Sequence, residues 1–210
     1  MRNLYIFLLV ILFNFNTNAQ SFYINAGQNN TSYKYKNSQN QELQELRNGF
    51  GMFIETGINI RINSKKEIKR WSSNLGLILN QFNSNAFINS SEYNWDVKYF
   101  GLKNDFIYSL TNKKSGLNLK LNAGLSLLQI ISGTQRTNDV FYDLKNNSEF
   151  EGLFLEPNIG TIISYTINKN TSFHFGYNIS KARKIKKTLG TENLSGFNNQ
   201  RIYFGFNFKI

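Results

Sequence analysis

Large apolar residues alternate with polar or small residues through the last ten positions of the chain. The apolar positions are Ile202, Phe204, Phe206, Phe208 and Ile210. The intervening positions are Arg201, Tyr203, Gly205, Asn207 and Lys209. Successive side chains of an extended strand point to opposite faces, so the segment is predicted to be a strand with one apolar and one polar face. An apolar face of this size is expected where a strand meets lipid.

The same alternation recurs in seven further segments, and the connections between the segments alternate in length. The segments span roughly residues 22–35, 50–62, 71–82, 96–110, 117–127, 152–165 and 173–180. Long polar stretches cover 36–48, 83–95, 132–150 and 182–200, whereas short ones cover 63–70, 111–115 and 168–171. This pattern predicts an all-β fold: an eight-stranded antiparallel up-and-down transmembrane β-barrel with short periplasmic turns and long extracellular loops. Asn104 interrupts one apolar face and is a candidate for a β-bulge.

The second face of the strands is rich in glycine, asparagine and charge, and it is predicted to line the lumen. An eight-stranded interior is just wide enough to be filled by side chains, so opposite charges there are expected to pair. The predicted lumen charge network consists of Glu55, Arg61, Lys103, Asp105, Lys120, Glu156, Arg201 and Lys209. The alternative is a soluble exported eight-stranded barrel, in which the apolar face turns inward and binds a small apolar ligand.

The first nineteen residues have the features of a secretory signal peptide. Arg2 supplies a positive charge, residues 4–13 form an apolar run, and a short polar stretch ends at Ala19, after which cleavage is predicted. The domains are therefore a signal peptide, 1–19, and a barrel domain, 20–210. The chain has no cysteine, which excludes disulfides and zinc–thiolate sites. The predicted location is the outer membrane of a Gram-negative-type cell.

The formal net charge is +11, with 24 Lys and Arg against 13 Asp and Glu. In an exported protein the expected counter-charges are phosphates of membrane lipids and surface glycolipid, not nucleic acid. A basic cluster in the last long connection is a candidate for such a phosphate contact, although a merely solvated loop explains it equally well. This cluster comprises Lys181, Arg183, Lys184, Lys186 and Lys187.

Candidate catalytic and metal-binding residues are sparse. His174 is the single histidine; it lies on the predicted inward face near a short turn, where a hydrogen-bonded lumen residue is the expected reading. Asp139, Asp143, Glu149 and Glu151 lack the spacing of a calcium loop. We therefore predict no enzyme activity, no cofactor and no metal, with a His-dependent outer-membrane enzyme as a third hypothesis.

The sequence resembles the small outer-membrane β-barrels related to OmpA and OmpX, in particular the branch of outer membrane protein β-barrel domains that includes PorT-like proteins. The similarity rests on Asn18-Ala19-Gln20, the strand 22–35, the segment Leu119–Gly124 and the aromatic last strand. The resemblance implies insertion by the outer-membrane assembly machinery and an association with protein secretion. The predicted role is structural or interactive, with a possible protein partner contacting the extracellular loops.

Overall fold

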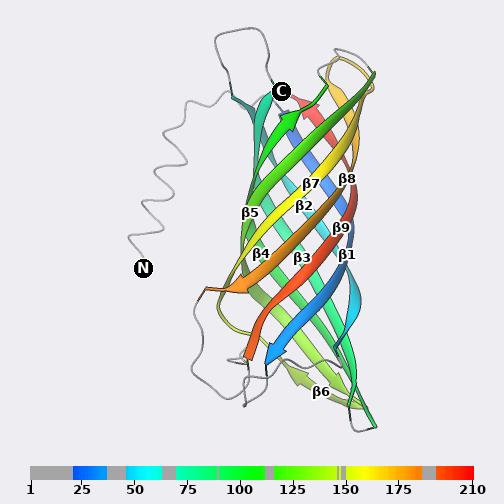
Figure 1. Cartoon of the computed structure of the whole chain (residues 1–210), viewed down its shortest axis with the longest axis vertical. Helices are drawn as coiled ribbons and strands as arrows, with labels where there is room; N and C mark the ends of the chain where they lie inside the picture. Colours follow the sequence, from blue (N-terminus) through cyan, green and yellow to red (C-terminus); the bar gives the residue numbers. More distant parts are fainter. Residues whose placement is uncertain are drawn as a thin grey trace.

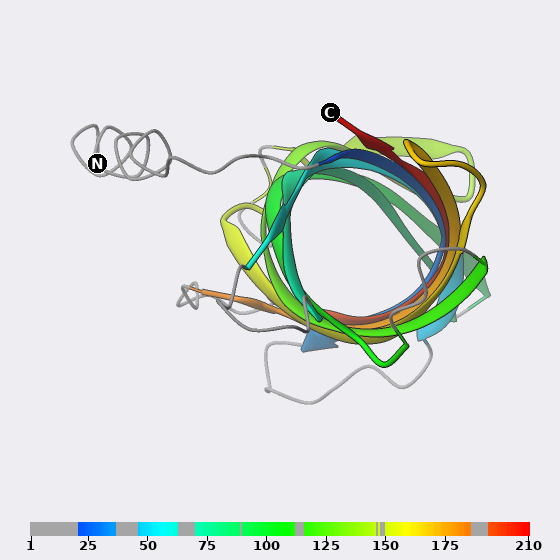
Figure 2. The same ribbon diagram turned by 90° about the horizontal axis from the view of Figure 1, so that it is seen from above.

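Eight antiparallel strands form a closed ring in the computed structural model of the chain (Figures 1 and 2). The structure describes residues 21–36, 46–62, 70–88, 90–111, 116–145, 147, 150–185 and 193–210. The ring runs in the order β4-β3-β2-β1-β9-β8-β7-β5, and the pairing of β4 with β5 closes it. The strands are β1 (Ser21–Lys36), β2 (Leu46–Arg61), β3 (Trp71–Ile88), β4 (Ser91–Ser109), β5 (Gly116–Thr137), β6 (Val140–Asp143), β7 (Leu153–Thr166), β8 (Thr171–Lys184) and β9 (Asn193–Lys209). The prediction of eight antiparallel strands in an up-and-down order is confirmed.

The connections at the two ends of the ring differ in length. Ser21 of β1 pairs with Lys209 of β9, so both lie at the end that carries the short connections. At the opposite end β5 continues past its last pair with β7 and forms a hairpin with β6 (Figure 1). No helix among the described residues is long and apolar enough to cross a membrane. The signal peptide predicted for 1–19 lies outside the described residues.

The prediction of a long loop at 83–95 is wrong. Strands β3 and β4 remain paired up to Ile88 and Ser91, and Ser90 between them adopts a left-handed φ of 65°. Where a strand extends past its apolar outer-face positions, both of its faces can be polar. The hydrophobic alternation then fades although the backbone hydrogen bonds between the strands continue. The other predicted long loops are shortened in the same way, because β5 extends to Thr137 and β8 to Lys184.

The predicted bulge at Asn104 is also wrong. The register of β4 against β3 and β5 is continuous there, and the Asn104 side chain donates a hydrogen bond to Ser73 Oγ at 2.9 Å. A partner on the neighbouring strand therefore satisfies the amide without any change in pairing. The register shift between β4 and β5 falls instead at Lys98/Tyr99.

Glycines on the inner wall give the lumen side chains their room. A Cβ at Gly176 would collide with the ring of Tyr203, the residue of β9 that pairs with Gly176. A Cβ at Gly124 would collide with the carboxylate of Asp105. The glycines therefore allow large and charged side chains to lie across the narrow interior.

Candidate functional site

A fully buried ion pair crosses the interior of the barrel. The Arg201 guanidinium on β9 contacts both carboxylate oxygens of Glu156 on β7, with its Nη2 at 2.6 and 2.7 Å from them. The side chains are 1% and 0% exposed. Ser180 Oγ donates to the same carboxylate at 2.7 Å, and Arg201 Nε donates to Asn29 Oδ1 at 3.2 Å. One guanidinium nitrogen thus spans both carboxylate oxygens, and the extra hydrogen bonds offset part of the desolvation of the two charges, while Arg201 Nη1 has no hydrogen-bond partner among the described residues.

A second buried cluster places one lysine between two carboxylates. Lys103 Nζ lies 2.9 Å from both Glu55 Oε2 and Asp105 Oδ2. Tyr23 donates its hydroxyl to Glu55 Oε1 at 2.8 Å, and Asn158 donates to Asp105 Oδ1 at 3.0 Å. Five of the eight charges predicted for the lumen network thus occupy these two clusters.

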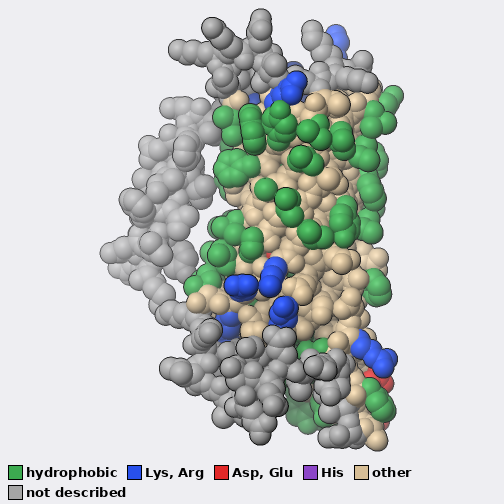
Figure 3. Space-filling view, in the orientation of Figure 1, with side chains coloured by type: hydrophobic (Ala, Val, Ile, Leu, Met, Phe, Trp, Pro, Cys, Tyr) green, Lys and Arg blue, Asp and Glu red, His purple; other side chains and the backbone are tan. Residues whose placement is uncertain are grey.

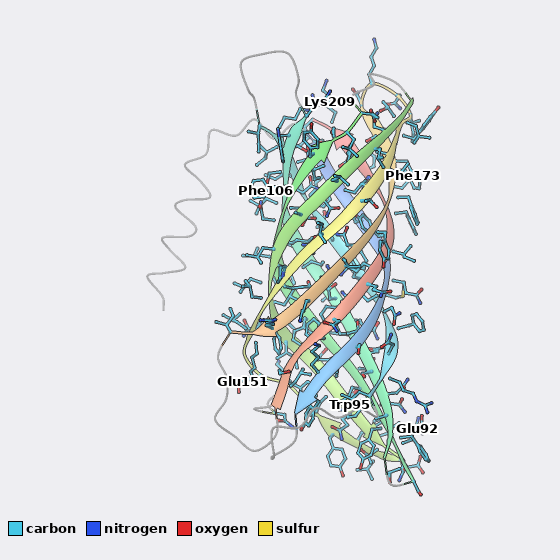
Figure 4. All side chains as sticks on the ribbon, in the orientation of Figure 1. Glu92, Trp95, Phe106, Glu151, Phe173 and Lys209 are labelled. Atoms are coloured by element: carbon cyan, nitrogen blue, oxygen red, sulfur yellow. The ribbon has the colours of Figure 1, made fainter. Side chains whose placement is uncertain are left out.

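The other three predicted network residues lie elsewhere. Arg61 and Lys209 are exposed near the short-turn end, and Lys120 is half-buried on β5. None of the three forms a salt bridge with another described residue. Figure 4 shows Lys209 at the end of the ring opposite Glu92. Their positions near strand ends put them beyond reach of the central carboxylates.

An aromatic layer fills the interior toward the end that carries β6, and the sequence analysis did not predict it. Phe197 of β9 is fully buried, with its ring centroid 4.3 Å from that of Phe82, 5.5 Å from Phe154 and 5.7 Å from Tyr99. Arg201 lies under this layer, 6.0 Å from the Phe82 ring. The sequence feature that could have indicated this layer is the presence of large aromatic residues, such as Phe154, on a strand face that is otherwise polar.

The connection between β6 and β7 adds two side chains to this layer. Leu144 and Phe150 are each 1% exposed, and the Phe150 ring lies 6.3 Å from that of Tyr33. The backbone N–H of Leu144 donates to the Gly133 carbonyl at 2.9 Å, which holds the segment against β5. The interior is thus occupied by the chain's own side chains, as expected for an eight-stranded barrel.

His174 is held by two amides at the short-turn end of the interior. Its Nε2 lies 2.7 Å from Asn25 Oδ1, and its Nδ1 lies 3.1 Å from Asn207 Nδ2. These partners fit the tautomer in which Nε2–H donates and Nδ1 accepts. Both ring nitrogens contact asparagines, so the contacts are those of a structural residue.

The outer face carries a belt of exposed apolar side chains (Figure 3). On β9, Ile202 is 53%, Phe204 54% and Phe208 42% exposed, whereas Tyr203 between them is buried. Phe206 is half-buried beside Phe208, and Ile210 is exposed. Phe106 of β4 and Phe173 of β8 also point away from the ring (Figure 4). This orientation is the reverse of a lipocalin-like barrel, whose apolar face turns inward.

The predicted basic cluster is divided by the strand pleat. Lys181 and Arg183 are exposed on the outer face of β8, in line with Ile179. Lys184 lies on the opposite face, and a Cβ at Gly152 would be 3.1 Å from its Cε. Lys186 and Lys187 lie outside the described residues, as does Glu149.

No protein-family model and no curated protein matches the sequence. Among solved structures the chain is similar to Neisserial surface protein A (NspA), with 15% identity, a TM-score of 0.49, and 90% of this chain and 97% of that chain covered. It is similar to OprG from Pseudomonas aeruginosa, with 10% identity, a TM-score of 0.46 and coverage of 91% and 97%. For Ail of Yersinia pestis the values are 10%, 0.39, 90% and 99%. The closed ring of paired strands described above establishes the fold.

Proposed function

We propose that this protein is a non-enzymatic outer-membrane β-barrel with a structural or surface-interaction role. The observation that carries the proposal is the exposed apolar belt on a closed ring whose charges pair inside. A closed barrel satisfies every backbone hydrogen bond between strands, which is the condition for crossing a bilayer with strands. In water, an apolar surface of this extent would be an aggregation site.

The filled interior favours anchoring or surface contacts over transport. The aromatic layer closes the lumen toward the β6 end, and the two ion clusters fill its centre. The extended β3–β4 and β5–β6 hairpins provide the surface that a partner outside the cell would contact. The association with protein secretion that the PorT-like resemblance implies stays a prediction.

Fractionation of cells combined with protease shaving tests this proposal. The protein should sediment with the outer membrane and require detergent for release. Protease added to intact cells should cut near the β5–β6 hairpin and spare the short turns, which face the periplasm in this orientation. Recovery of the protein in the soluble periplasmic fraction would favour the soluble ligand-binding alternative and refute the proposal.

A charge introduced on the outer face should destabilise the protein only where that face lies in the hydrocarbon of the membrane. Phe204→Arg should destabilise the protein in lipid vesicles by about 2–4 kcal/mol, because a cation near the bilayer midplane loses its hydration. Ser132→Arg is the matched control, since Ser132 is exposed and pairs with Lys98 on the outer face, beyond the belt. Denaturant titration followed by tryptophan fluorescence gives both values. Equal costs would contradict burial of the belt in hydrocarbon.

A further inference from the structure

Three cations lie on the outer face of three neighbouring strands at the edge of the apolar belt. The strand register places Lys34 of β1 and Arg183 of β8 on either side of Gly196 of β9. One step along the same face, Lys181 pairs with Asn198, which also pairs with Ser32. Figure 3 shows Lys and Arg side chains gathered below the apolar belt on the face that β8, β9 and β1 share.

Gly196, which is buried, carries no side chain between the two flanking cations. A Cβ there would collide with the Ala182 carbonyl oxygen, so the glycine is required by the close approach of β8. The backbones that carry Lys34 and Arg183 are roughly 10 Å apart, which is twice the spacing of adjacent strands. Both side chains are long enough to bring their charged ends to one anion over Gly196.

No acidic side chain in the described part of the chain pairs with these cations. Lys34, Lys181 and Arg183 form no salt bridge with any described residue, in contrast to Lys103, Arg136 and Arg201. Lys34 is half-buried, while Lys181 and Arg183 are exposed. Three cations without an ion-pair partner in the described ranges, within two rows of one sheet face, create a local excess of positive charge that favours an anionic partner.

The neighbouring outer-face residues indicate what the anion is attached to. On β8 the outer face changes from Ile179 to Lys181 in one step, which marks the boundary between hydrocarbon and headgroups. On β9 and β1 the same region carries Asn198, Gln200 and Asn30, whose amides suit sugar hydroxyls. Guanidinium and ammonium groups beside such amides match a phosphorylated sugar at the membrane surface.

We propose that Lys34, Lys181 and Arg183, arranged around Gly196, form a binding site for the phosphate of a glycolipid headgroup in the outer leaflet. This inference rests on the proposed function, because it needs the belt to lie in the membrane. Arg183 contacts the phosphate in a bidentate manner, Lys34 contacts it from the other side of Gly196, and Lys181 neutralises the remaining charge. The amides of Asn198 and Gln200 contact the sugar.

The test uses the full chain in phosphatidylcholine vesicles titrated with bisphosphorylated lipid A. The variant Lys34→Gln/Lys181→Gln/Arg183→Gln should bind lipid A on the order of 100-fold more weakly than the wild type, about fivefold for each cation removed. The control Arg61→Gln/Lys98→Gln/Lys209→Gln removes the same charge from exposed positions outside the site and should leave the affinity unchanged. Lipid A without phosphates should bind the wild type as weakly as the triple variant does.

Several results would overturn the site. They are an equal loss of affinity in the control variant, equal binding of dephosphorylated lipid A, and equal competition by phosphatidylglycerol, which would mean attraction to any anionic surface. Flotation of the vesicles distinguishes a failure of the proposed function from a failure of this binding site alone. A wild-type protein that does not float with the vesicles refutes the proposed function. A protein that inserts but shows no preference for phosphate refutes only this site.

Discussion

Glu156→Gln should destabilise the folded barrel by about 3–5 kcal/mol. The substitution keeps the size of the side chain but leaves the Arg201 guanidinium, 1% exposed, without its counter-charge in the interior. The other groups around Arg201, which are the Asn29 amide oxygen and the rings of Phe53 and Phe82, carry no net charge. The midpoint of denaturant unfolding in vesicles, read from tryptophan fluorescence, gives the change.

Two variants provide the controls for this result. Arg136→Gln removes one partner of the exposed pair with Asp139 and should leave the midpoint unchanged, because water solvates both groups. Glu156→Leu combined with Arg201→Met removes both buried charges and should recover part of the lost stability. An unchanged midpoint for Glu156→Gln would mean that Arg201 finds another anion or water, and the buried pair would lose its assigned role.

Phe197→Ala should cost about 3–5 kcal/mol as well, through a different mechanism. Phe197 is fully buried between Phe82, Phe154 and Tyr99, and truncation leaves a cavity that the rigid barrel wall cannot close. The same titration measures the loss. The loss of unfolding free energy should add to the loss caused by a substitution at a distant position of the same strand.

Phe175→Ala is the matched control for the aromatic layer. Phe175 is 47% exposed on the outer face of β8, where, in the membrane setting proposed above, lipid replaces the lost contacts. Its truncation should therefore cost clearly less than that of Phe197. If the two substitutions cost the same, the interior aromatic layer is loosely packed and does not seal the barrel.

The alternation of residue types was sufficient to predict the ring and the direction of its side chains. Phe204 and Ile202 are exposed and Arg201 is buried, as period two requires. Pattern alone could not predict which charges would meet across strands, because Lys103 of β4 contacts Glu55 of β2 over the intervening strand β3, and only the register of the three strands brings the two side chains together. The prediction therefore included Arg61 and Lys209, which share the face but lie near strand ends.

The strand extensions and the aromatic layer were missed for related reasons. The segment around Asn83 and Asn94 has polar residues on both faces, and a polar strand in water has no periodic signal that distinguishes it from a loop. Phe154 falls on the inward face by its period-two position, but the pattern gives no sign that its ring meets those of Tyr99 and Phe197 from other strands. Leu144 comes from a connection, and no strand pattern indicates that it packs into the lumen.

The pairing of the first strand with the last has a consequence for biogenesis. Tyr23 lies opposite Asn207 and Ala26 opposite Phe204, so the seam that completes the cylinder joins positions nearly the whole polypeptide apart. No earlier stretch of chain can complete the cylinder on its own, and every partial intermediate keeps two unpaired edges. Closure of the cylinder therefore waits until β9 has been synthesised and can reach β1.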